Sequence, residues 1–324
     1  MRTVVGVLRG GPSSEYDISL LSGAHVLGAF DTDHYDTRDI FIDKQGKWHS
    51  KGVEVQPERA LQGIDVAFNV LHGEYGENGD VQRILEAVGT PYTGSDAFAS
   101  TLAFNKHTTR EIVTRAGIKV PSGIVVEQDG DVERLALDMF RTFPHPAIVK
   151  PVVGGSSVGM THADSYHALH DGLHLAFAHS PKVLVEEFIK GKEATVGVIE
   201  DFRDEPLYAL MPVEIVPPPT HSFFTYEAKS SGESIERVPG NFSAEEKKQL
   251  MELAKQAHSV MGAGHYSRSD FIVSKRGIYF LEINSAAAVG MTKESLFPKA
   301  IAAVGSSMKD FLHHVVQLAL RGRA

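Results

Sequence analysis

The sequence predicts an α/β protein built from more than one domain. Apolar runs of strand length alternate with segments of helical periodicity along the whole chain, and glycine-rich turns follow several of these runs. This alternation is typical of layered α/β folds, which bind ligands in the loops after their strands. A chain of 324 residues is also too long for one ordinary hydrophobic core, so we expect two or three domains.

Composition limits the classes of function that the chain can have. Hydrophobic residues make up 42% of the chain and charged residues 23%, as in globular proteins. A net charge of -9 argues against a nucleic-acid partner. Cysteine is absent, which excludes disulfides, thiolate metal sites and cysteine nucleophiles. No segment has the length of a membrane span or the pattern of a cleavable leader, so we expect a cytoplasmic protein without a membrane partner.

The N-terminal segment has the pattern strand, glycine turn, helix. Residues 4–8 form an apolar run, and Glu15 lies in the first turn of the helix that follows the glycines. A carboxylate there either interacts with the helix dipole or faces a ligand's ammonium. A second strand at 66–71 leads into a glycine-rich polar loop that begins at His72, and we expect a domain boundary near Ser95. The helix after the glycine turn carries its apolar residues at Ile18, Leu21, Val26 and Leu27.

The middle of the chain contains a glycine-rich hairpin. Lys150 lies near the end of an apolar strand, and residues 154–160 follow with several glycines and the hydroxyls of Ser156 and Ser157. Glycines permit the backbone angles that let such a hairpin wrap phosphates with its N-H groups. The pattern G-x-x-x-x-G-K-[ST] is missing, which rules out a P-loop. A plain β-hairpin that binds no ligand remains the alternative.

The last part of the chain contains a long loop before a capped helix. Residues 217–240 include three consecutive prolines and little apolar content. Loops of this length inside compact domains are usually functional lids. Ser243 and Glu246 then form a predicted capping box, which starts a helix that runs to about Met261.

Two segments are candidates for binding a metal. Residues 277–284 read as a strand that ends by presenting Glu282 and Asn284 from one side, because strand side chains repeat every second residue. Asp270 opens the neighbouring strand, so two carboxylates and one amide oxygen should meet, as in Mg²⁺ sites beside nucleotide phosphates. Solvated strand ends are the alternative. The second candidate is a zinc site on a helix whose histidines lie one turn apart, at His167, His170 and His174.

In this order the motifs resemble those of the D-alanine-D-alanine ligases, which are members of the ATP-grasp superfamily. The resemblance covers nearly the whole chain, and its specificity lies in the joint order, because unrelated chains would not place nine such elements in one sequence. The elements are Gly10-Gly11-x-Ser13-x-Glu15, His72-Gly73-x-x-Gly76-Glu77-x-Gly79, Pro91-Tyr92-Thr93-Gly94-Ser95, Val149-Lys150-Pro151, Gly155-Ser156-Ser157-Val158-Gly159-Met160, Tyr226-Glu227-Ala228-Lys229, Arg268-x-Asp270, Glu282-Ile283-Asn284 and Gly290-Met291-Thr292.

The resemblance implies a three-domain ATP-grasp architecture with a Rossmann-like N-terminal domain and an α+β ATP-grasp part. The domains would comprise residues 1–95, 96–182 with the phosphate-binding hairpin, and 183–324 with the metal site and the lid loop. In this family ATP phosphorylates the carboxylate of one D-alanine. The amine of a second D-alanine then attacks the acyl phosphate, which gives the dipeptide for peptidoglycan, ADP and phosphate. The resemblance also implies a homodimer.

The same resemblance assigns roles to individual residues. Two Mg²⁺ ions, which Mn²⁺ could replace, would be held by Asp270, Glu282 and Asn284. ATP would contact Lys106, Lys150, Ser156, Ser157, Glu186, Ile189, Glu193 and Lys229, and Ser156 and Lys229 would also lie at the reacting groups. The first D-alanine would bind Glu15 with His72 nearby, and the carboxylate of the second would bind Ser295 and Leu296. The oxyanion of the tetrahedral intermediate would face Arg268 and the N-H of Gly290.

Two places depart from the family's pattern. Residues 285–289 separate Asn284 from Gly290, whereas the family has a shorter connection that contains a proline. The connection carries the Gly290 amide, and a shift of about 1 Å in that amide could cost ~100-fold in rate. Ser230 stands where D-alanine-specific enzymes have tyrosine and their D-lactate or D-serine relatives have histidine or phenylalanine. Three interpretations therefore stay open: a D-alanine-D-alanine ligase, a ligase with a changed second substrate such as D-lactate, D-serine or another amine, and a catalytically impaired ATP-binding homologue.

Overall fold

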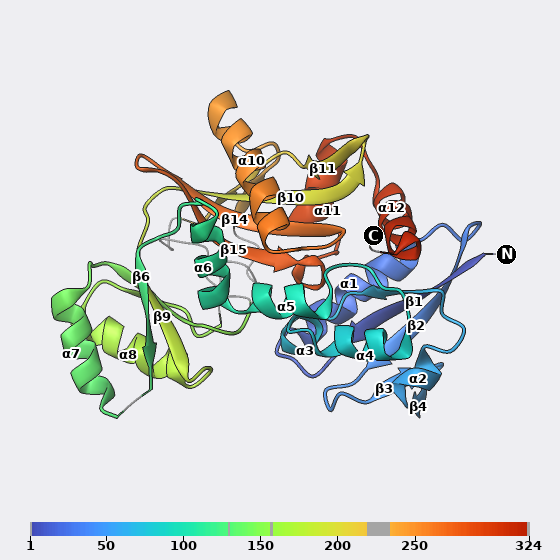
Figure 1. Cartoon of the computed structure of the whole chain (residues 1–324), viewed down its shortest axis with the longest axis horizontal. Helices are drawn as coiled ribbons and strands as arrows, with labels where there is room; N and C mark the ends of the chain where they lie inside the picture. The colour runs from blue at the N-terminus through green and yellow to red at the C-terminus, as the bar shows by residue number, and fades with distance from the viewer. Residues whose placement is uncertain (1, 129, 156–157, 219–233, 323–324) are drawn as a thin grey trace.

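Three β-sheets organise the described part of the chain, which comprises residues 2–128, 130–155, 158–218 and 234–322 of a computed structural model. Figure 1 shows the N-terminal sheet at the lower right, the central sheet at the lower left and the C-terminal sheet above them. Two consecutive helices, α5 (Ala97–Phe104) and α6 (Lys106–Arg115), cross the space between the first two sheets. The mixture of strands and helices agrees with the predicted fold class.

The N-terminal sheet is built around β1 (Thr3–Gly10), which carries the first expected strand. β1 pairs in parallel with β2 (Tyr35–Ile42) on one side and with β5 (Val66–Asn69) on the other. A parallel strand inside a sheet is covered on both faces, which explains its continuous apolar run. The strand order is β4-β3-β2-β1-β5. The remaining elements are β3 (Trp48–Ser50), β4 (Val53–Val55), α1 (Tyr16–Ala29), α2 (Pro57–Ala60), α3 (Glu74–Glu77) and α4 (Asp80–Val88).

Helix α1 forms where the sequence predicts it, but its buried face differs from the expected one. The side chains of Ile18 and Leu21 are 40% and 64% exposed. The face that packs against the sheet consists of small residues, because it makes hydrogen bonds to strand ends. The hydroxyl of Ser19 accepts a bond from the Gly10 amide at 2.9 Å and donates one to the Val70 carbonyl at 2.7 Å. The buried residues of the helix are Ser19, Ser22, Gly23 and Val26.

The central sheet contains the glycine-rich hairpin. Its strands run antiparallel in the order β6-β9-β7-β8. The hairpin connects β7 to β8, and two of its residues, Ser156 and Ser157, lie outside the described residues. Helices α7 and α8 pack against the strands through a separate hydrophobic core. The bounds are β6 (Gly123–Glu127), α7 (Val132–Thr142), β7 (Ala147–Pro151), β8 (Thr161–Ala163), α8 (Tyr166–Phe177) and β9 (Lys182–Glu187).

The C-terminal sheet contains the strand pair expected to present the carboxylates. β14 (Tyr266–Ser274) and β15 (Gly277–Ser285) pair antiparallel, with a bulge between Asp270 and Phe271. The order is β13-β12-β10-β14-β15, with β11 paired to β10. The predicted capping box at Ser243 is present and starts α10 (Ala244–Val260). The other elements are β10 (Lys192–Phe202), β11 (Glu205–Ala209), β12 (Val213–Val216), β13 (Ile235–Arg237), the 3-10 helix η1 (Ala286–Ala288), α11 (Leu296–Ala303) and α12 (Met308–Arg321).

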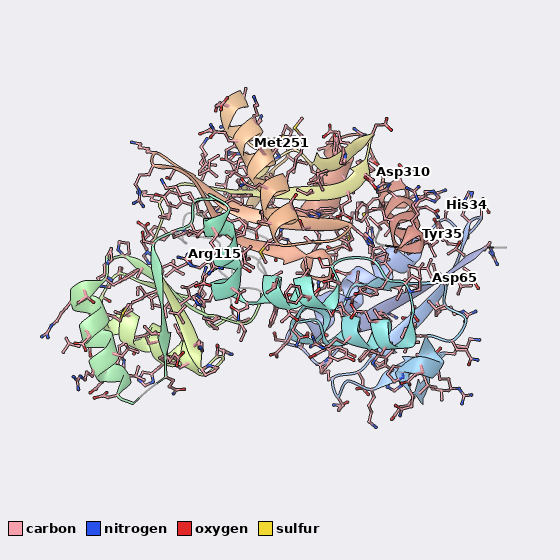
Figure 2. All side chains as sticks on the ribbon, viewed as in Figure 1. His34, Tyr35, Asp65, Arg115, Met251 and Asp310 are labelled. Atoms are coloured by element: carbon pink, nitrogen blue, oxygen red, sulfur yellow. The ribbon has the colours of Figure 1, made fainter. Side chains whose placement is uncertain are left out.

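The C-terminal helix α12 packs on the N-terminal sheet. Its apolar residues share one hydrophobic core with β1 and β5. At the rim of this contact the hydroxyl of Tyr35 lies 2.7 Å from Nδ1 of His313, and Lys309 pairs with Asp31 at 2.9 Å. Figure 2 shows Tyr35 and the neighbouring His34 next to the start of α12. The hydrogen bond and charge of Lys309 hold the pKa of Asp31 below its usual range. Helix α12 is therefore fastened to the N-terminal sheet at Asp31 and Tyr35.

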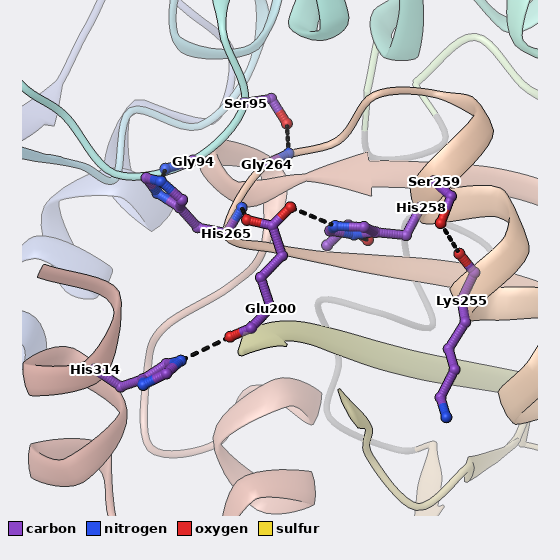
Figure 3. A network of polar contacts seen from close by, with 10 residues as sticks. Gly94, Ser95, Glu200, Lys255, His258, Ser259, Gly264, His265 and His314 are labelled. Atoms are coloured by element: carbon purple, nitrogen blue, oxygen red, sulfur yellow. Dashed lines mark hydrogen bonds and ion pairs between the residues drawn. The ribbon is translucent and has the colours of Figure 1, made fainter. Parts of the chain in front are cut away.

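A polar network joins the exit of the N-terminal sheet to the C-terminal sheet (Figure 3). The Gly94 amide donates to Nδ1 of His265 at 2.9 Å, and the Gly264 amide donates to the Ser95 hydroxyl at 3.1 Å. Glu200 on β10 accepts a bond from the His265 amide at 2.7 Å. Because His265 Nδ1 accepts a hydrogen bond, its proton must be on the other ring nitrogen when the ring is neutral. The network fixes the start of β14 relative to residues 94 and 95.

The predicted division of the chain at residues 95 and 182 stays a prediction. β9 begins at Lys182 and pairs with β6 and β7, so a boundary at 182 would separate this strand from its own sheet. We propose that the central domain extends through Glu187. None of the helices in the described ranges combines the length and the apolar character that a membrane span requires.

Candidate functional site

Two adjoining cavities lie between the sheets. The first has a volume of about 380 Å³ and lies between the N-terminal and C-terminal sheets; we call it the acidic cavity, and its lining includes Glu15, His72, Glu77, Asn284, Gly290 and Ser295. The second has a volume of about 270 Å³ and lies between the central and C-terminal sheets; we call it the apolar cavity, and its lining includes Ile148, Lys150, Met160, Glu186, Ile189 and Ile272. Both are lined by Lys106, Gly155, Arg268, Leu281, Glu282 and Leu296.

The wall that the cavities share is the strand pair β14 and β15. Asp270 lies directly opposite Glu282, and Arg268 lies opposite Asn284, so the four side chains emerge on one face of the sheet. Nε and Nη2 of Arg268 donate to the two carboxylate oxygens of Asp270 at 3.1 and 3.0 Å. Burial opposes the charged form of Arg268, but the charge and hydrogen bonds of Asp270 together with the nearby glutamates outweigh burial and raise the arginine pKa. The expected convergence of two carboxylates and one amide is therefore present.

These side chains fit a divalent cation that also binds phosphates. Asp270 and Glu282 face each other across the strands, and like charges in that position destabilise a sheet unless a cation lies between them. The Asn284 amide lies 3.0 Å from Asp270, and its orientation could reverse to offer oxygen. The described residues contain no group of three His, Asp or Glu side chains placed to hold a metal by themselves. Mg²⁺ commonly binds one or two carboxylates and completes its shell with water and substrate phosphate, which agrees with this set.

Two lysines reach the cavities from opposite sides. Lys106 begins α6, and its Nζ donates to the Gly154 carbonyl at 2.5 Å. Burial lowers the pKa of Lys106, and the nearby Glu282 carboxylate opposes this effect. Lys150 Nζ lies 2.5 Å from Glu186, whose other oxygen binds Arg110. Glu186 is therefore held by two cations, and sequence reasoning missed Arg110 because nothing in its local pattern marks it.

The apolar cavity combines these charges with hydrophobic walls. Ile148 and Met160 come from the central sheet, and Ile272 and Leu281 come from β14 and β15. Flat apolar walls beside a few polar groups are typical of sites for planar ring systems. The structure brings five predicted ATP contacts to this cavity, namely Lys106, Lys150, Glu186, Ile189 and Glu193. Their individual roles stay predictions.

Two carboxyl groups define the acidic cavity. Glu15 and Glu77 both approach Gly155 of the hairpin, where an added Cβ would lie 3.2 Å from Glu15 and 3.8 Å from Glu77. Burial, reinforced by the charge of Glu15, raises the pKa of Glu77 to about 8. The Gly73 amide donates to Glu77 at 2.6 Å and partly offsets this effect. Glu77 belongs to the glycine motif that begins at His72, but the residue types of this motif do not show that Glu77 is buried.

His72 lies beneath the same cavity as a buried neutral group. Its Nε2 lies 2.9 Å from the Ser22 hydroxyl, and its ring also bonds to the backbone of Ala287. Burial lowers the pKa of His72 to about 4, so the ring is neutral near pH 7. A neutral imidazole there can donate or accept a hydrogen bond but adds no charge beside a bound amino acid.

The long connection after Asn284 is ordered by packing. η1 follows β15 directly, and Ala286, Ala287 and Val289 are buried. Gly290 lies against Ser295, since a Cβ on Gly290 would be 2.8 Å from the serine hydroxyl. The longer connection therefore brings the amide of Gly290 and the Ser295 hydroxyl to one wall of the acidic cavity.

Several predicted residues are not in these cavities. Ser156, Ser157, Lys229 and Ser230 lie outside the described residues, so their roles stay predictions. The three histidines of the zinc alternative lie on α8, away from the lining of either cavity. Sequence reasoning missed Glu236 of β13, which lines the acidic cavity and pairs with Lys299 at 2.8 Å. Glu236 lies on a short strand after a proline-rich loop, and its local sequence has no pattern that marks a binding residue.

Comparison with known proteins defines the class. Models of the D-ala D-ala ligase N-terminus match residues 4–60 and 50–95, and the model of the D-ala D-ala ligase C-terminus matches residues 112–317. The D-alanine-D-alanine ligase of Geobacter sulfurreducens is 36% identical and covers 97% of this chain and 93% of the relative. That of Mannheimia succiniciproducens is 34% identical and covers 97% of each chain.

Solved structures agree with these relatives. The VanG D-Ala:D-Ser ligase of Enterococcus faecalis is similar with a TM-score of 0.85 and 27% identity, covering 98% of this chain and 100% of that chain. D-alanyl-alanine synthetase A of Vibrio cholerae is similar with a TM-score of 0.84 and 27% identity, covering 99% of both. The architecture is thus the ATP-grasp fold that the motifs predict. The chain belongs to the D-alanine-D-alanine ligase family, whose members are ATP-dependent ligases that generally use Mg²⁺.

Proposed function

We propose that this chain is a D-alanine-D-alanine ligase that supplies the dipeptide for peptidoglycan. The observation that carries the proposal is the shared wall, where the apolar cavity meets the acidic cavity at Arg268 and Glu282. A nucleotide in one cavity can place its terminal phosphate beside an amino-acid carboxylate in the other. Holding both reactants in this way lowers the barrier mainly by orientation and charge stabilisation.

The reaction proceeds in two steps at this wall. The carboxylate of the first D-alanine attacks the γ-phosphorus, a new oxygen-phosphorus bond forms, and the bond to ADP breaks. The amine of the second D-alanine then attacks the acyl carbon, the carbon-oxygen bond to phosphate breaks, and the amine proton leaves with phosphate. Glu15 holds the ammonium of the first substrate, and Ser295 with Leu296 holds the carboxylate of the second. Arg268 and the N-H of Gly290 face the oxyanion between these steps.

The charges of the triphosphate are met by lysines and by metal. Lys106 and Lys150 lie at the shared wall and the apolar cavity, where they would contact phosphates. Asp270, Glu282 and Asn284 would hold two Mg²⁺ ions, or Mn²⁺, which neutralise charge on the transferred phosphoryl group. Ile189 would contact the adenine and Glu193 the ribose. Ser156, Ser157 and Lys229 complete the proposed phosphate contacts.

The alternative of a changed second substrate is not favoured. Curated D-alanine-D-alanine ligases at 34 to 36% identity over nearly the whole chain support D-alanine as the second substrate. The intact set of metal-binding side chains also argues against an impaired homologue. We further propose a homodimer that acts in the cytoplasm, where ATP is available.

The proposal is tested by product mass after incubation with ATP, Mg²⁺ and D-alanine, alone and with D-lactate or D-serine. The expected result is the D-alanine dipeptide with one ADP released per product, even when the competitors are present. A mixed product as the main species would contradict the substrate assignment, and ATP binding without product would contradict the activity.

A further inference from the structure

The segment from Ser285 to Met291 is fastened to the N-terminal domain, although it follows a strand of the C-terminal sheet. Val289 and Met291 are fully buried in the hydrophobic core that also contains Val5 and Phe68 of the N-terminal sheet. The sequence predicts that this segment is longer than in the family's pattern. The packing decides where the amide of Gly290 points, because Gly290 lies between the two buried residues.

Helix α1 holds both sides of the Met291 backbone. Nδ1 of His25 donates a hydrogen bond to the Met291 carbonyl at 2.6 Å. The Met291 amide donates a longer and weaker hydrogen bond to the Ser22 hydroxyl at 3.4 Å. Residues 22 and 25 are three apart, which places them on one face of the helix. The Met291 amide belongs to the peptide before Met291 and the Met291 carbonyl to the peptide after it. The contacts therefore hold both peptides that flank Met291, and they fix the C-terminal side of the adjoining Gly290.

Two further contacts hold the start of the segment. The Ser22 hydroxyl also bonds to His72 at 2.9 Å, and His72 bonds to the backbone of Ala287. Gly94 packs on Ala286 so closely that a Cβ at position 94 would lie 2.6 Å from the Ala286 Cβ. The Gly94 amide is itself fixed by His265, as Figure 3 shows. The N-terminal domain therefore contacts the segment at residues 286, 287 and 291.

We propose that His25 and Ser22 are positioning residues that set the Gly290 amide against the tetrahedral intermediate. The inference rests on the proposed function, because that function gives Gly290 its role. The two residues act through Met291 and touch no substrate themselves. An oxyanion donor must lie within tenths of an ångström of its place before the reaction, so a shift of Met291 that displaces the adjoining Gly290 lowers the rate of the chemical step.

The test compares His25→Ala with two other variants of the full chain. His25→Asn keeps an N-H donor at the position of Nδ1 and should restore the bond. His314→Ala removes a matched contact, in which a histidine nitrogen donates to the Glu200 carbonyl at 2.7 Å, remote from both cavities. kcat and the KM values for ATP and D-alanine are measured by ADP release, and folding is measured by the thermal midpoint.

The expected result is a fall of about 10-fold in kcat for His25→Ala, with the KM for ATP within about 2-fold of the wild type. His25→Asn should recover most of the loss, and His314→Ala should keep the wild-type kcat. A wild-type kcat in His25→Ala, an equal loss in His314→Ala, or no recovery in a folded His25→Asn would overturn the inference. A wild-type enzyme that forms no dipeptide would contradict the proposed function instead, whatever the variants do.

Discussion

The two cavities differ in what lines them, although they share a wall. The acidic cavity gathers carboxyl groups, with Glu15 and the buried Glu77 on one side and Glu282 on the other. The apolar cavity has hydrophobic walls from two sheets, and its carboxylate Glu186 is already neutralised by Lys150 and Arg110. A cavity of the first kind attracts an ammonium group, and one of the second kind accepts a planar ring with phosphates at its charged end.

The difference shows where specificity and activation reside. On the proposed function, the carboxyl groups of the acidic cavity would select the amino-acid substrate, and the ion pairs and apolar area of the other cavity would hold the nucleotide. On the same proposal the reaction would take place where the two cavities meet, at Arg268 and Glu282. Substitutions on either side should therefore affect different substrates, and substitutions in the shared wall should affect the rate.

The largest effect is expected in the shared wall. Asp270→Asn removes a metal-binding carboxylate and leaves Arg268 without its partner, so we expect kcat to fall about 10³-fold, since a bound metal contributes several kcal/mol to the transition state. Glu282→Gln should cause a similar loss without disturbing that ion pair. Glu54→Gln, a change in an exposed pair with Lys47, is the control. ADP release across a Mg²⁺ titration measures all three, and a folded Asp270→Asn enzyme with more than a tenth of wild-type activity would contradict the metal assignment.

The next effect separates the two cavities. Glu15→Gln removes the charge that holds the ammonium, so the KM for D-alanine should rise about 10- to 100-fold, as expected for a lost charged hydrogen bond. Lys150→Met should instead raise the KM for ATP by a similar factor, because it removes a cation from the apolar cavity. Steady-state kinetics with each substrate varied in turn provides the measurement. Equal effects of both variants on both substrates would mean that the cavities are not specialised.

The smallest effect concerns the pH dependence of stability. The pKa of Glu77 is raised from 4.5 to about 8 in the folded protein, so the folded state keeps a proton that the unfolded state loses. The free energy of unfolding should therefore fall as pH rises from about 4.5 to about 8, by at most about 1.4 kcal/mol per pH unit from this group. Glu77→Gln should flatten this slope, as measured by urea unfolding at several pH values. A variant with the wild-type slope would show that Glu77 is ionised in the folded protein.

Local patterns predicted the elements and the convergence of polar side chains on the shared wall. The period of two in strands placed Asp270, Glu282 and Asn284 on one face, and the structure has this arrangement. The sequence pattern does not predict the bulge after Asp270, because the bulge depends on how β15 pairs with β14. The helical pattern also placed Ile18 in the core, where the structure has hydrogen-bonding serines instead. Helical periodicity of apolar residues predicts the buried face of a helix that packs through hydrophobic contacts. It does not predict the buried face of a helix that packs through polar contacts.

Long-range contacts could not be predicted in the same way. His25 and Met291 are 266 positions apart, and neither residue type marks the bond between them. The raised pKa of Glu77 follows from burial under the hairpin, which only the folded chain provides. The order of the motifs identified the family, and the roles that it assigns to individual residues stay predictions. The geometry of the connection after Asn284 had to come from the structure.

The most direct test follows the oxygen atoms of the first substrate. D-Alanine labelled with ¹⁸O in its carboxylate is incubated with ATP and Mg²⁺, and the dipeptide and the released phosphate are analysed by mass spectrometry. If a carboxylate in the acidic cavity takes the phosphoryl group from ATP in the apolar cavity, each dipeptide formed must leave one labelled oxygen in phosphate. Unlabelled phosphate released together with dipeptide would contradict the acyl-phosphate route and the account of two cavities that meet at one reacting wall.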